Sequence, residues 1–234
     1  MSKLDKTIAV MDLHVGSDIA DVVELSPLAH VGLPARGGPA SISRIVRAKA
    51  SSRTLVASAV LEEASVTGIL VLRASTGKEA LASALQTTLN VKLPERLASH
   101  SISDKYCVRW MSPDEWLLTC PLDEAFELEN KLRAAADGPI AIVNVSGGYS
   151  LLTLSGESAL KVLKKSTSYD VHPDSFGPGK VVNTVMAKAQ VTLRAVGEDR
   201  YEIIVRRSFA DYLWLWLQRA GKEYGLEAFS LTAS

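Results

Sequence analysis

Two consecutive stretches of the sequence share one order of predicted elements, a strand, a helix, two strands and a second helix, and each stretch contains additional predicted strands. Apolar runs indicate the strands, and apolar residues three or four positions apart indicate the helices. The first stretch has predicted strands at 60–61, 68–72, 106–111 and 116–120, with helices after Thr76 and Asp123. The second has predicted strands at 140–145, 149–154, 181–186, 190–196 and 201–205, with helices after Ser155 and Ser208. This order is typical of a split β-α-β plait and predicts an α+β fold with two plait-like halves.

Turn signals predict where the two halves meet. Asp137-Gly138-Pro139 ends the second helix, so we expect a first half at 26–138 and a second at 139–234. Residues 1–25 mix acidic, basic and apolar positions without a sustained period, which predicts a weakly ordered N-terminal segment. A short strand at 28–33 is predicted after it.

Local side chains predict the starts of three helices. Thr76-Gly77-Lys78-Glu79 and Ser208-Phe209-Ala210-Asp211 have the form of a capping box, in which a hydroxyl accepts a hydrogen bond from a backbone amide while an acidic side chain reaches back. Asp123 is expected to cap a third helix through its carboxylate.

Composition excludes several classes of protein. Lys plus Arg and Asp plus Glu both total 26, so no net charge attracts nucleic acid or an anionic membrane. Apolar runs such as 69–72 are far shorter than the roughly 20 residues that span a bilayer. The N-terminus lacks the apolar region of a secretory signal. We therefore expect a cytoplasmic protein that binds neither nucleic acid nor a membrane.

Motifs that carry chemistry are absent from the sequence. It contains no GxGxxG turn for a dinucleotide, no P-loop and no GxSxG elbow. Cys107 and Cys120 fall on predicted neighbouring strands, where two buried thiols are favoured over a disulfide. Without CxxC or paired histidines, no zinc site is expected. We expect no catalytic residue, cofactor site or metal site in this chain.

Two aromatic and charged clusters allow more than one interpretation. Asp170-Val171-His172-Pro173-Asp174 could bind a metal or move a proton, but capping of nearby backbone amides is the favoured interpretation. Trp110 and Trp116 flank the turn at Ser112-Pro113 and could stack on a flat ligand, whereas packing in the core and the turn is favoured.

The last predicted helix is apolar on more than one side. One apolar face is predicted to comprise Phe209, Tyr212, Leu213, Trp216 and Leu217, while Ala210, Trp214 and Leu215 add a second. Such a helix is either packed between the two halves or in contact with another subunit, since aromatic residues are enriched at interfaces. The candidate partner interface comprises Asp170, His172, Phe176, Trp214 and Leu215.

Several short motifs, taken in order, resemble the gamma subunit family of heterotetrameric sarcosine oxidase over about residues 26–225. They are Ser26-Pro27-Leu28, Leu72-Arg73, the segments 112–118 and 144–147, Leu154-Ser155-Gly156, Asp170-Val171-His172-Pro173 and Arg207-Ser208-Phe209-Ala210. The resemblance implies a fold like the folate-binding domain of aminomethyltransferases. It also implies a complex of alpha, beta, gamma and delta chains that oxidatively demethylates sarcosine to glycine. That complex passes the one-carbon unit to tetrahydrofolate and produces hydrogen peroxide.

In this family FAD, FMN and NAD belong to the alpha and beta chains and zinc to the delta chain, so the resemblance implies a non-catalytic structural subunit. An alternative is a stand-alone folate-dependent aminomethyltransferase, which would need a polar pterin site and an acid that the sequence does not reveal. A second alternative is an iron–sulfur assembly factor of the same fold. Lys105-Tyr106-Cys107 lacks the glycine of that factor's signature.

Overall fold

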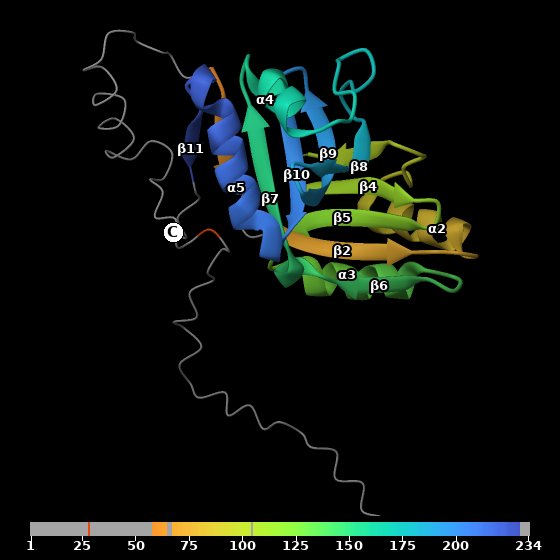
Figure 1. The fold of residues 1–234 in the computed structure, drawn as a ribbon. Coiled ribbons are helices and arrows are strands. Elements are labelled where there is room, and N and C mark those ends of the chain that lie inside the picture. Colours follow the sequence, from red (N-terminus) through yellow and green to blue (C-terminus); the bar gives the residue numbers. More distant parts are fainter. Residues whose placement is uncertain (1–27, 29–57, 65–66, 104, 230–234) are drawn as a thin grey trace, which may run out of the picture.

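The computed structural model describes residues 28, 58–64, 67–103 and 105–229. These residues form two β-sheets, each with helices on one face (Figure 1). The predicted segment 1–25 and nearly all of the strand predicted at 28–33 lie outside the described residues. The α+β fold is confirmed, and no helix in the described part is long and apolar enough to cross a membrane.

Six of the described strands form sheet A in the order β11-β1-β7-β10-β9-β8. Their bounds are β1 Val60–Glu63, β7 Tyr149–Ser155, β8 Val181–Met186, β9 Ala189–Gly197, β10 Arg200–Arg206 and β11 Glu227–Phe229. Neighbouring strands are antiparallel, except that β1 and β11 run parallel. The helices α4 (Ala159–Ser166) and α5 (Arg207–Gly221) cover one face, and the short 3₁₀ helix η4 (Lys222–Tyr224) leads into β11.

Five of the described strands form sheet B, entirely antiparallel, in the order β3-β4-β5-β2-β6. Their bounds are β2 Thr67–Arg73, β3 Ser99–Ile102, β4 Tyr106–Ser112, β5 Glu115–Pro121 and β6 Ala141–Asn144. The helices α2 (Lys78–Leu89) and α3 (Ala125–Ala135) pack on its outer face, and the 3₁₀ helix η3 (Ser146–Gly148) connects β6 to β7.

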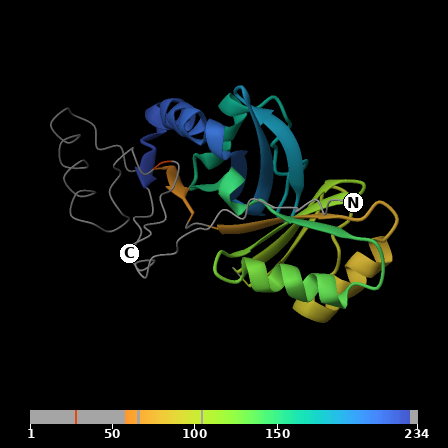
Figure 2. The ribbon, with the colours of Figure 1, turned by 90° about the horizontal axis from the view of Figure 1, so that it is seen from below.

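The inner faces of the two sheets meet in the middle of the molecule, with helices on opposite outer sides (Figure 2). A small apolar cluster joins the sheets there, comprising Ile69 and Leu117 from sheet B and Ile204 from sheet A. Both faces of the central strands are therefore buried, as in β5, where five consecutive residues from Trp116 to Cys120 are buried.

Two strands pair across the predicted division at 138. β1 lies between β7 and β11 in sheet A, although it comes first in the sequence. β6, which follows the division, pairs with β2 in sheet B. The division into 26–138 and 139–234 stays a prediction, but hydrogen bonds of both sheets connect residues from the two sides of it.

The predicted helix caps are wrong. In the described residues, the N-cap positions of α2, α3 and α5 are Gly77, Glu124 and Arg206, not the predicted Thr76, Asp123 and Ser208, and none of these three residues caps its helix through its side chain. α2 begins after Gly77, where an added Cβ would lie 2.5 Å from the carbonyl oxygen of Pro139, so the close approach of the Pro139 backbone requires glycine at this helix start. α5 follows β10 without a loop, and Ser208 already lies inside its first turn.

The packing interpretation of the two tryptophans is confirmed. Trp116 is buried in the core of sheet B, and its indole N–H donates to the carbonyl oxygen of Pro94 at 2.9 Å. Trp110 lies directly opposite on β4 and packs against the same core. Both side chains therefore stabilise the sheet and its helices.

Candidate functional site

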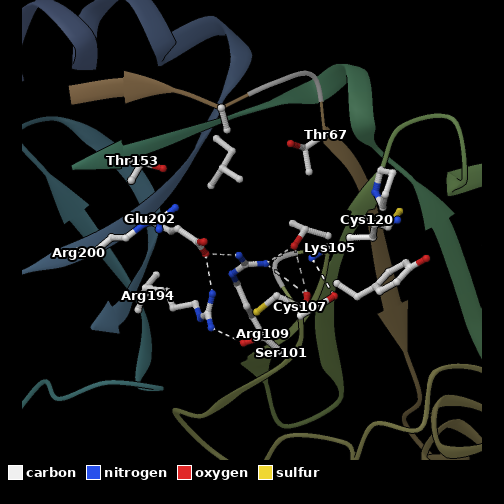
Figure 3. Close-up of a pocket in the computed structure, with 17 residues that line it drawn as sticks. Thr67, Ser101, Lys105, Cys107, Arg109, Cys120, Thr153, Arg194, Arg200 and Glu202 are labelled. Carbon is white, nitrogen blue, oxygen red and sulfur yellow. Dashed lines mark hydrogen bonds and ion pairs between the residues drawn. The ribbon is translucent and has the colours of Figure 1, made fainter. Parts of the chain in front are cut away.

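A cavity of about 350 Å³ lies between the inner faces of the two sheets (Figure 3). Both sheets contribute to its wall, with residues from β3, β4 and β5 on one side and from β7, β9 and β10 on the other. The lining is polar and rich in cations, which include Arg109, Arg194, Lys105 and Arg200.

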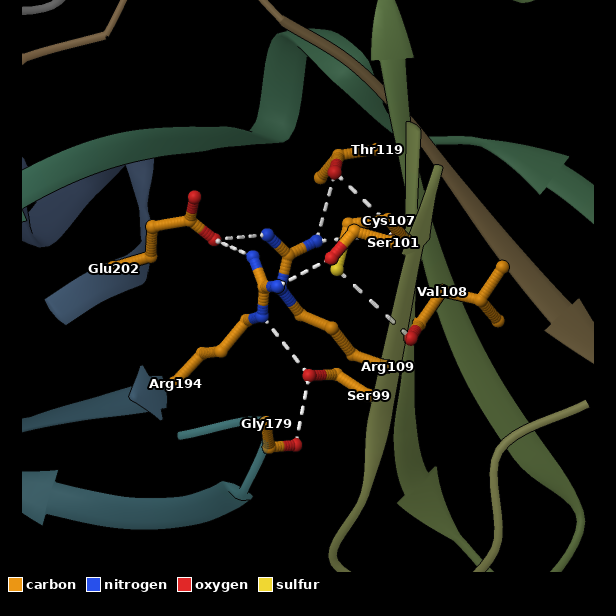
Figure 4. Close-up of polar contacts among 9 residues, drawn as sticks. All are labelled: Ser99, Ser101, Cys107, Val108, Arg109, Thr119, Gly179, Arg194 and Glu202. Atoms are coloured by element: carbon orange, nitrogen blue, oxygen red, sulfur yellow. Dashed lines mark hydrogen bonds and ion pairs between the residues drawn. The ribbon is translucent and has the colours of Figure 1, made fainter. Parts of the chain in front are cut away.

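An Arg–Glu–Arg cluster connects the sheets beside this cavity (Figure 4). The Arg109 guanidinium on β4 donates from Nη2 to Oε2 of Glu202 on β10 at 2.5 Å. The same carboxylate oxygen accepts a hydrogen bond from Nη1 of Arg194 on β9 at 2.9 Å. One carboxylate therefore holds two guanidinium groups from opposite sheets.

Hydroxyl groups and a backbone carbonyl complete the cluster. Nη1 of Arg109 donates to Oγ1 of Thr119 at 2.8 Å and to the carbonyl oxygen of Cys107 at 3.3 Å. Arg194 donates from Nε to Oγ of Ser99 at 2.9 Å and from Nη2 to Oγ of Ser101 at 2.6 Å. These contacts fix both guanidinium planes in position.

Strand alternation places these polar side chains on the inner faces. On β10, Tyr201, Ile203 and Val205 pack into the core of sheet A, so the side chain of Glu202 points to the opposite face. β9 behaves in the same way, with Leu193 and Ala195 in the core on either side of Arg194. The period of two residues thus directs one charged side chain from each strand toward sheet B.

The Arg–Glu–Arg cluster carries more positive than negative charge. Burial alone would raise the pKa of Glu202, but the charges and hydrogen bonds of Arg109 and Arg194 outweigh it and hold that pKa below its ordinary value. Glu202 is therefore a carboxylate at neutral pH. Two buried cations face one anion, and Nε of Arg109 has no hydrogen-bond partner among the described residues.

The ionisable groups around the cavity suit binding better than catalysis. The hydrogen bond to Glu124 raises the pKa of Tyr106 to about 12, so this phenol stays protonated near pH 7. Burial raises the pKa of the Cys120 thiol to about 11, which keeps it from acting as a nucleophile. Glu202 is held as an anion by its two arginine partners. The cavity combines positive charge with a phenol and a thiol that stay protonated and a carboxylate that stays ionised near neutral pH.

Cys107 and Cys120 are both buried thiols, as predicted, and lie on neighbouring strands. Because the pKa of Cys120 is about 11 against an ordinary 9.0, its thiolate fraction at pH 8 is about 100-fold below that of an unfolded chain. We expect iodoacetamide to alkylate Cys120 at least about 100-fold more slowly in the folded chain than in urea. Peptide mass spectrometry of timed samples measures both rates, and equal rates would contradict the burial of this thiol.

The predicted loop cluster has the capping geometry expected of it. Asp170 accepts a hydrogen bond at Oδ1 from the backbone N–H of His172 at 3.0 Å, and Nδ1 of His172 lies 3.3 Å from the backbone nitrogen of Asp174. A hydrogen bond with Ser175, followed by that with the His172 amide, lowers the pKa of Asp170. Among the described residues, no group of three or more His, Cys, Asp or Glu could hold a metal ion.

Two of the five candidate interface residues are buried in their own chain. Phe176 is 2% exposed, stacks on Tyr201 at a centroid distance of 6.4 Å and meets Tyr169 edge to face. Trp214 is 0% exposed in the core of sheet A. Neither side chain offers surface to a partner in this conformation. This corrects their assignment to the interface, while Asp170, His172 and Leu215 are exposed.

The apolar faces predicted for α5 do not coincide with the face that is buried. Its buried residues follow a single stripe of helical period, comprising Ala210, Leu213, Trp214, Leu217 and Gly221. α5 lies beside α4 on the outer face of sheet A, so the interpretation that the two halves enclose it is also wrong (Figure 2). Phe209, Leu215 and Trp216 keep 43%, 53% and 36% of their surface exposed.

Sequence reasoning missed the cavity residues, although a signal was present. Arg109, Arg194 and Glu202 each interrupt an apolar predicted strand with one charged side chain. A charged residue inside a strand that is otherwise buried needs a partner of opposite charge. The sequence does not say which partner, because Arg109 and Glu202 are separated by 93 positions.

The two sheets, their outer helices and the cavity between the sheets define an aminomethyltransferase-like fold. Aminomethyltransferase T of the glycine cleavage system from Bartonella henselae has this fold, with a TM-score of 0.56 and 18% identity over 75% of this chain and 48% of that one. The chain also matches the sarcosine oxidase, gamma subunit family over residues 73–223. This protein belongs to that family.

Individual relatives agree with this assignment. The chain is 32% identical over 190 residues to sarcosine oxidase subunit gamma of an Arthrobacter species, covering 81% of this chain and 91% of the relative. It is 35% identical over 162 residues to the same subunit of Corynebacterium sp. strain P-1, covering 68% and 77%. A chain of the solved heterotetrameric sarcosine oxidase of Corynebacterium sp. U-96 superposes with a TM-score of 0.69 and 29% identity, covering 89% and 98%.

Proposed function

We propose that this protein is the gamma subunit of a heterotetrameric sarcosine oxidase and a non-catalytic structural component of that enzyme. The observation that carries the proposal is the superposition on a chain of the Corynebacterium enzyme, which extends over 98% of that chain. The complex would oxidatively demethylate sarcosine to glycine, transfer the one-carbon unit to tetrahydrofolate and produce hydrogen peroxide.

The proposed partners are alpha, beta and delta subunits, which would hold FAD, FMN, NAD and zinc. The donor set of this chain supports that division. Among the described residues, no cluster of His, Cys, Asp or Glu suits a metal, and the sequence has no glycine-rich dinucleotide turn. The chemistry would therefore take place on the partner chains.

A stand-alone aminomethyltransferase is not favoured. The aminomethyltransferase of Geobacillus thermodenitrificans matches over only 39% of this chain and 26% of its own length. A transferase also needs an acid or base free to exchange a proton with the substrate. In the cavity, the Glu202 carboxylate is instead bound by two guanidinium groups.

The exposed part of α5 is the surface we propose for contact with a partner subunit. Phe209, Leu215 and Trp216 leave apolar surface outside the core of this chain. Aromatic and aliphatic side chains of this kind form the centres of protein interfaces. The exposed Asp170 and His172 would add polar contacts from the loop that follows α4.

A native pull-down of the tagged chain from its own cells tests the proposed function. We expect three further chains to co-purify, with flavin absorbance bands and sarcosine-dependent production of peroxide. A colourless protein that purifies alone and binds tetrahydrofolate would overturn the proposal in favour of the transferase.

Replacing Leu215 by glutamate tests the contact surface. Because Leu215 is 53% exposed, the isolated chain should keep its stability to within about 0.5 kcal/mol. A charge buried in an interface without a partner should weaken assembly by about 2 kcal/mol or more, close to thirtyfold in affinity. Co-purification yield and calorimetric titration with the partner subunits measure the loss.

The matched control is Ser83→Glu, an exposed position on α2 at the outer face of sheet B. It introduces the same charge far from α5 and should leave assembly unchanged. Equal assembly of wild-type and Leu215→Glu chains would exclude this side of α5 as the contact surface.

A further inference from the structure

We propose that the cavity between the two sheets binds a small organic acid with two carboxylate groups. The proposal concerns this chain alone and does not depend on which complex it joins. It rests on the charge balance, the volume and the lining of the cavity.

The buried charges in the cavity wall do not balance. Arg109 is 1% exposed and Arg194 is 7% exposed, yet they share a single carboxylate, that of Glu202. A buried cation without a counter-charge is unfavourable, and arginine does not relieve it by losing its proton. Among the residues that line the cavity, one buried positive charge is therefore left for an anion to neutralise.

The cavity is also lined by cations whose side chains are exposed. Lys105 and Arg200 line the same cavity with exposed side chains, and neither forms an ion pair with a described residue. Cavities lined by one sign of charge concentrate ligands of the opposite sign. With one buried uncompensated charge and two exposed cations in its lining, the cavity matches a dianion better than a monoanion.

The volume and the hydrogen-bonding groups of the cavity also fit a small dicarboxylate. A volume of about 350 Å³ lies at the low end of small-molecule sites, which suits a ligand of few atoms. Ser101 accepts a hydrogen bond from Arg194, so its own O–H is available to donate. Thr153 contributes a second hydroxyl from the opposite sheet. Guanidinium groups and hydroxyls are the donors that recognise carboxylates.

Calorimetric titration of the full chain with succinate at low ionic strength tests the proposal. We expect a dissociation constant below about 1 mM and weaker binding at higher salt, as for any charge-dependent site. Acetate, with one carboxylate, should bind at least about tenfold more weakly, and neutral succinamide should not bind. No heat with succinate, or equal binding of succinamide, would overturn the proposal.

Variants locate the ligand. Arg194→Gln should weaken succinate binding at least about thirtyfold, the cost of removing one partner of a buried charge pair. Because this change could also unfold the chain, Arg200→Gln provides a second test at an exposed side chain. It should weaken binding about fivefold. Arg96→Gln removes an exposed arginine that does not line the cavity and should change nothing.

The variant results separate the alternatives. Equal losses for Arg200→Gln and Arg96→Gln would mean that succinate binds by general surface charge, which overturns the site. Binding of inorganic phosphate without binding of succinate would overturn the dicarboxylate assignment. If a folded Arg194→Gln chain bound succinate as tightly as the wild type, the proposal would be overturned. The Arg–Glu–Arg cluster would then serve only to connect the two sheets.

Discussion

Replacing Trp214 by alanine should destabilise the isolated chain by about 3–5 kcal/mol, the usual cost of truncating a buried aromatic side chain. Trp214 is 0% exposed and lies among the residues that connect α5 to sheet A. A loss of this size is a large part of the 5–15 kcal/mol that typically stabilises a domain. We therefore expect the variant to be largely unfolded or strongly shifted in its urea transition.

Urea unfolding followed by tryptophan fluorescence and circular dichroism measures this loss. Leu215→Ala, on the next residue of the helix and 53% exposed, should change the free energy of unfolding by less than about 0.5–1 kcal/mol. Trp214→Phe should cost less than the alanine variant, because the indole N–H has no hydrogen-bond partner among the described residues. Equal effects at positions 214 and 215 would contradict the assignment of Trp214 to the core.

Replacing Glu202 by glutamine should cost about 3–5 kcal/mol, although the side chain keeps its shape. The change leaves Arg109 and Arg194 buried without a counter-charge and removes the charge-assisted bonds that connect β4, β9 and β10. Glu198→Gln, a matched change at an exposed side chain in the turn before β10, should stay within about 0.5 kcal/mol of the wild type. A similar stability for both variants would show that the cluster contributes little.

The stability difference between wild type and Glu202→Gln should depend on pH with a definite sign. The pKa of Glu202 in the folded chain lies below its ordinary value of 4.5, because the attraction of two arginines exceeds the effect of burial. A carboxyl with a lowered pKa stabilises the fold fully above its unfolded pKa, and this contribution is lost as the pH falls through the folded pKa. The difference should be constant above about pH 5.5 and shrink below 4.5.

Binding of a dianion should strengthen the connection between the sheets. Any ligand that binds the folded chain and not the unfolded one raises its stability in proportion to the logarithm of ligand concentration. Since the cavity wall comes from both sheets, succinate should raise the midpoint of thermal unfolding of the wild-type chain. The same succinate concentration should raise the midpoint of Arg194→Gln far less, because its binding is weaker.

Much of the fold was predictable because it depends on local periodicity. The alternation in Tyr201–Val205 and the apolar spacing in 81–85 belong to consecutive residues, and the structure confirms a strand and a helix there. The motifs that resemble the gamma subunit family likewise depend on short stretches, and the family assignment is confirmed. Helix caps were predicted less well, because the N-cap of α2 is Gly77, where the backbone of Pro139, more than 60 positions away, leaves no room for a side chain.

The sequence by itself determined most of the strands and helices, the α+β class and the family, since neighbouring residues encode all three, whereas the short edge strands β3 and β11 were not predicted. Only the tertiary structure decided that β1 joins sheet A, that β6 joins sheet B and that Trp214 faces the core. It also decided the cavity, because Arg109 and Glu202 meet only when two sheets built from distant segments pack face to face. Such contacts depend on long-range packing and charge pairing, which no local pattern of residues records.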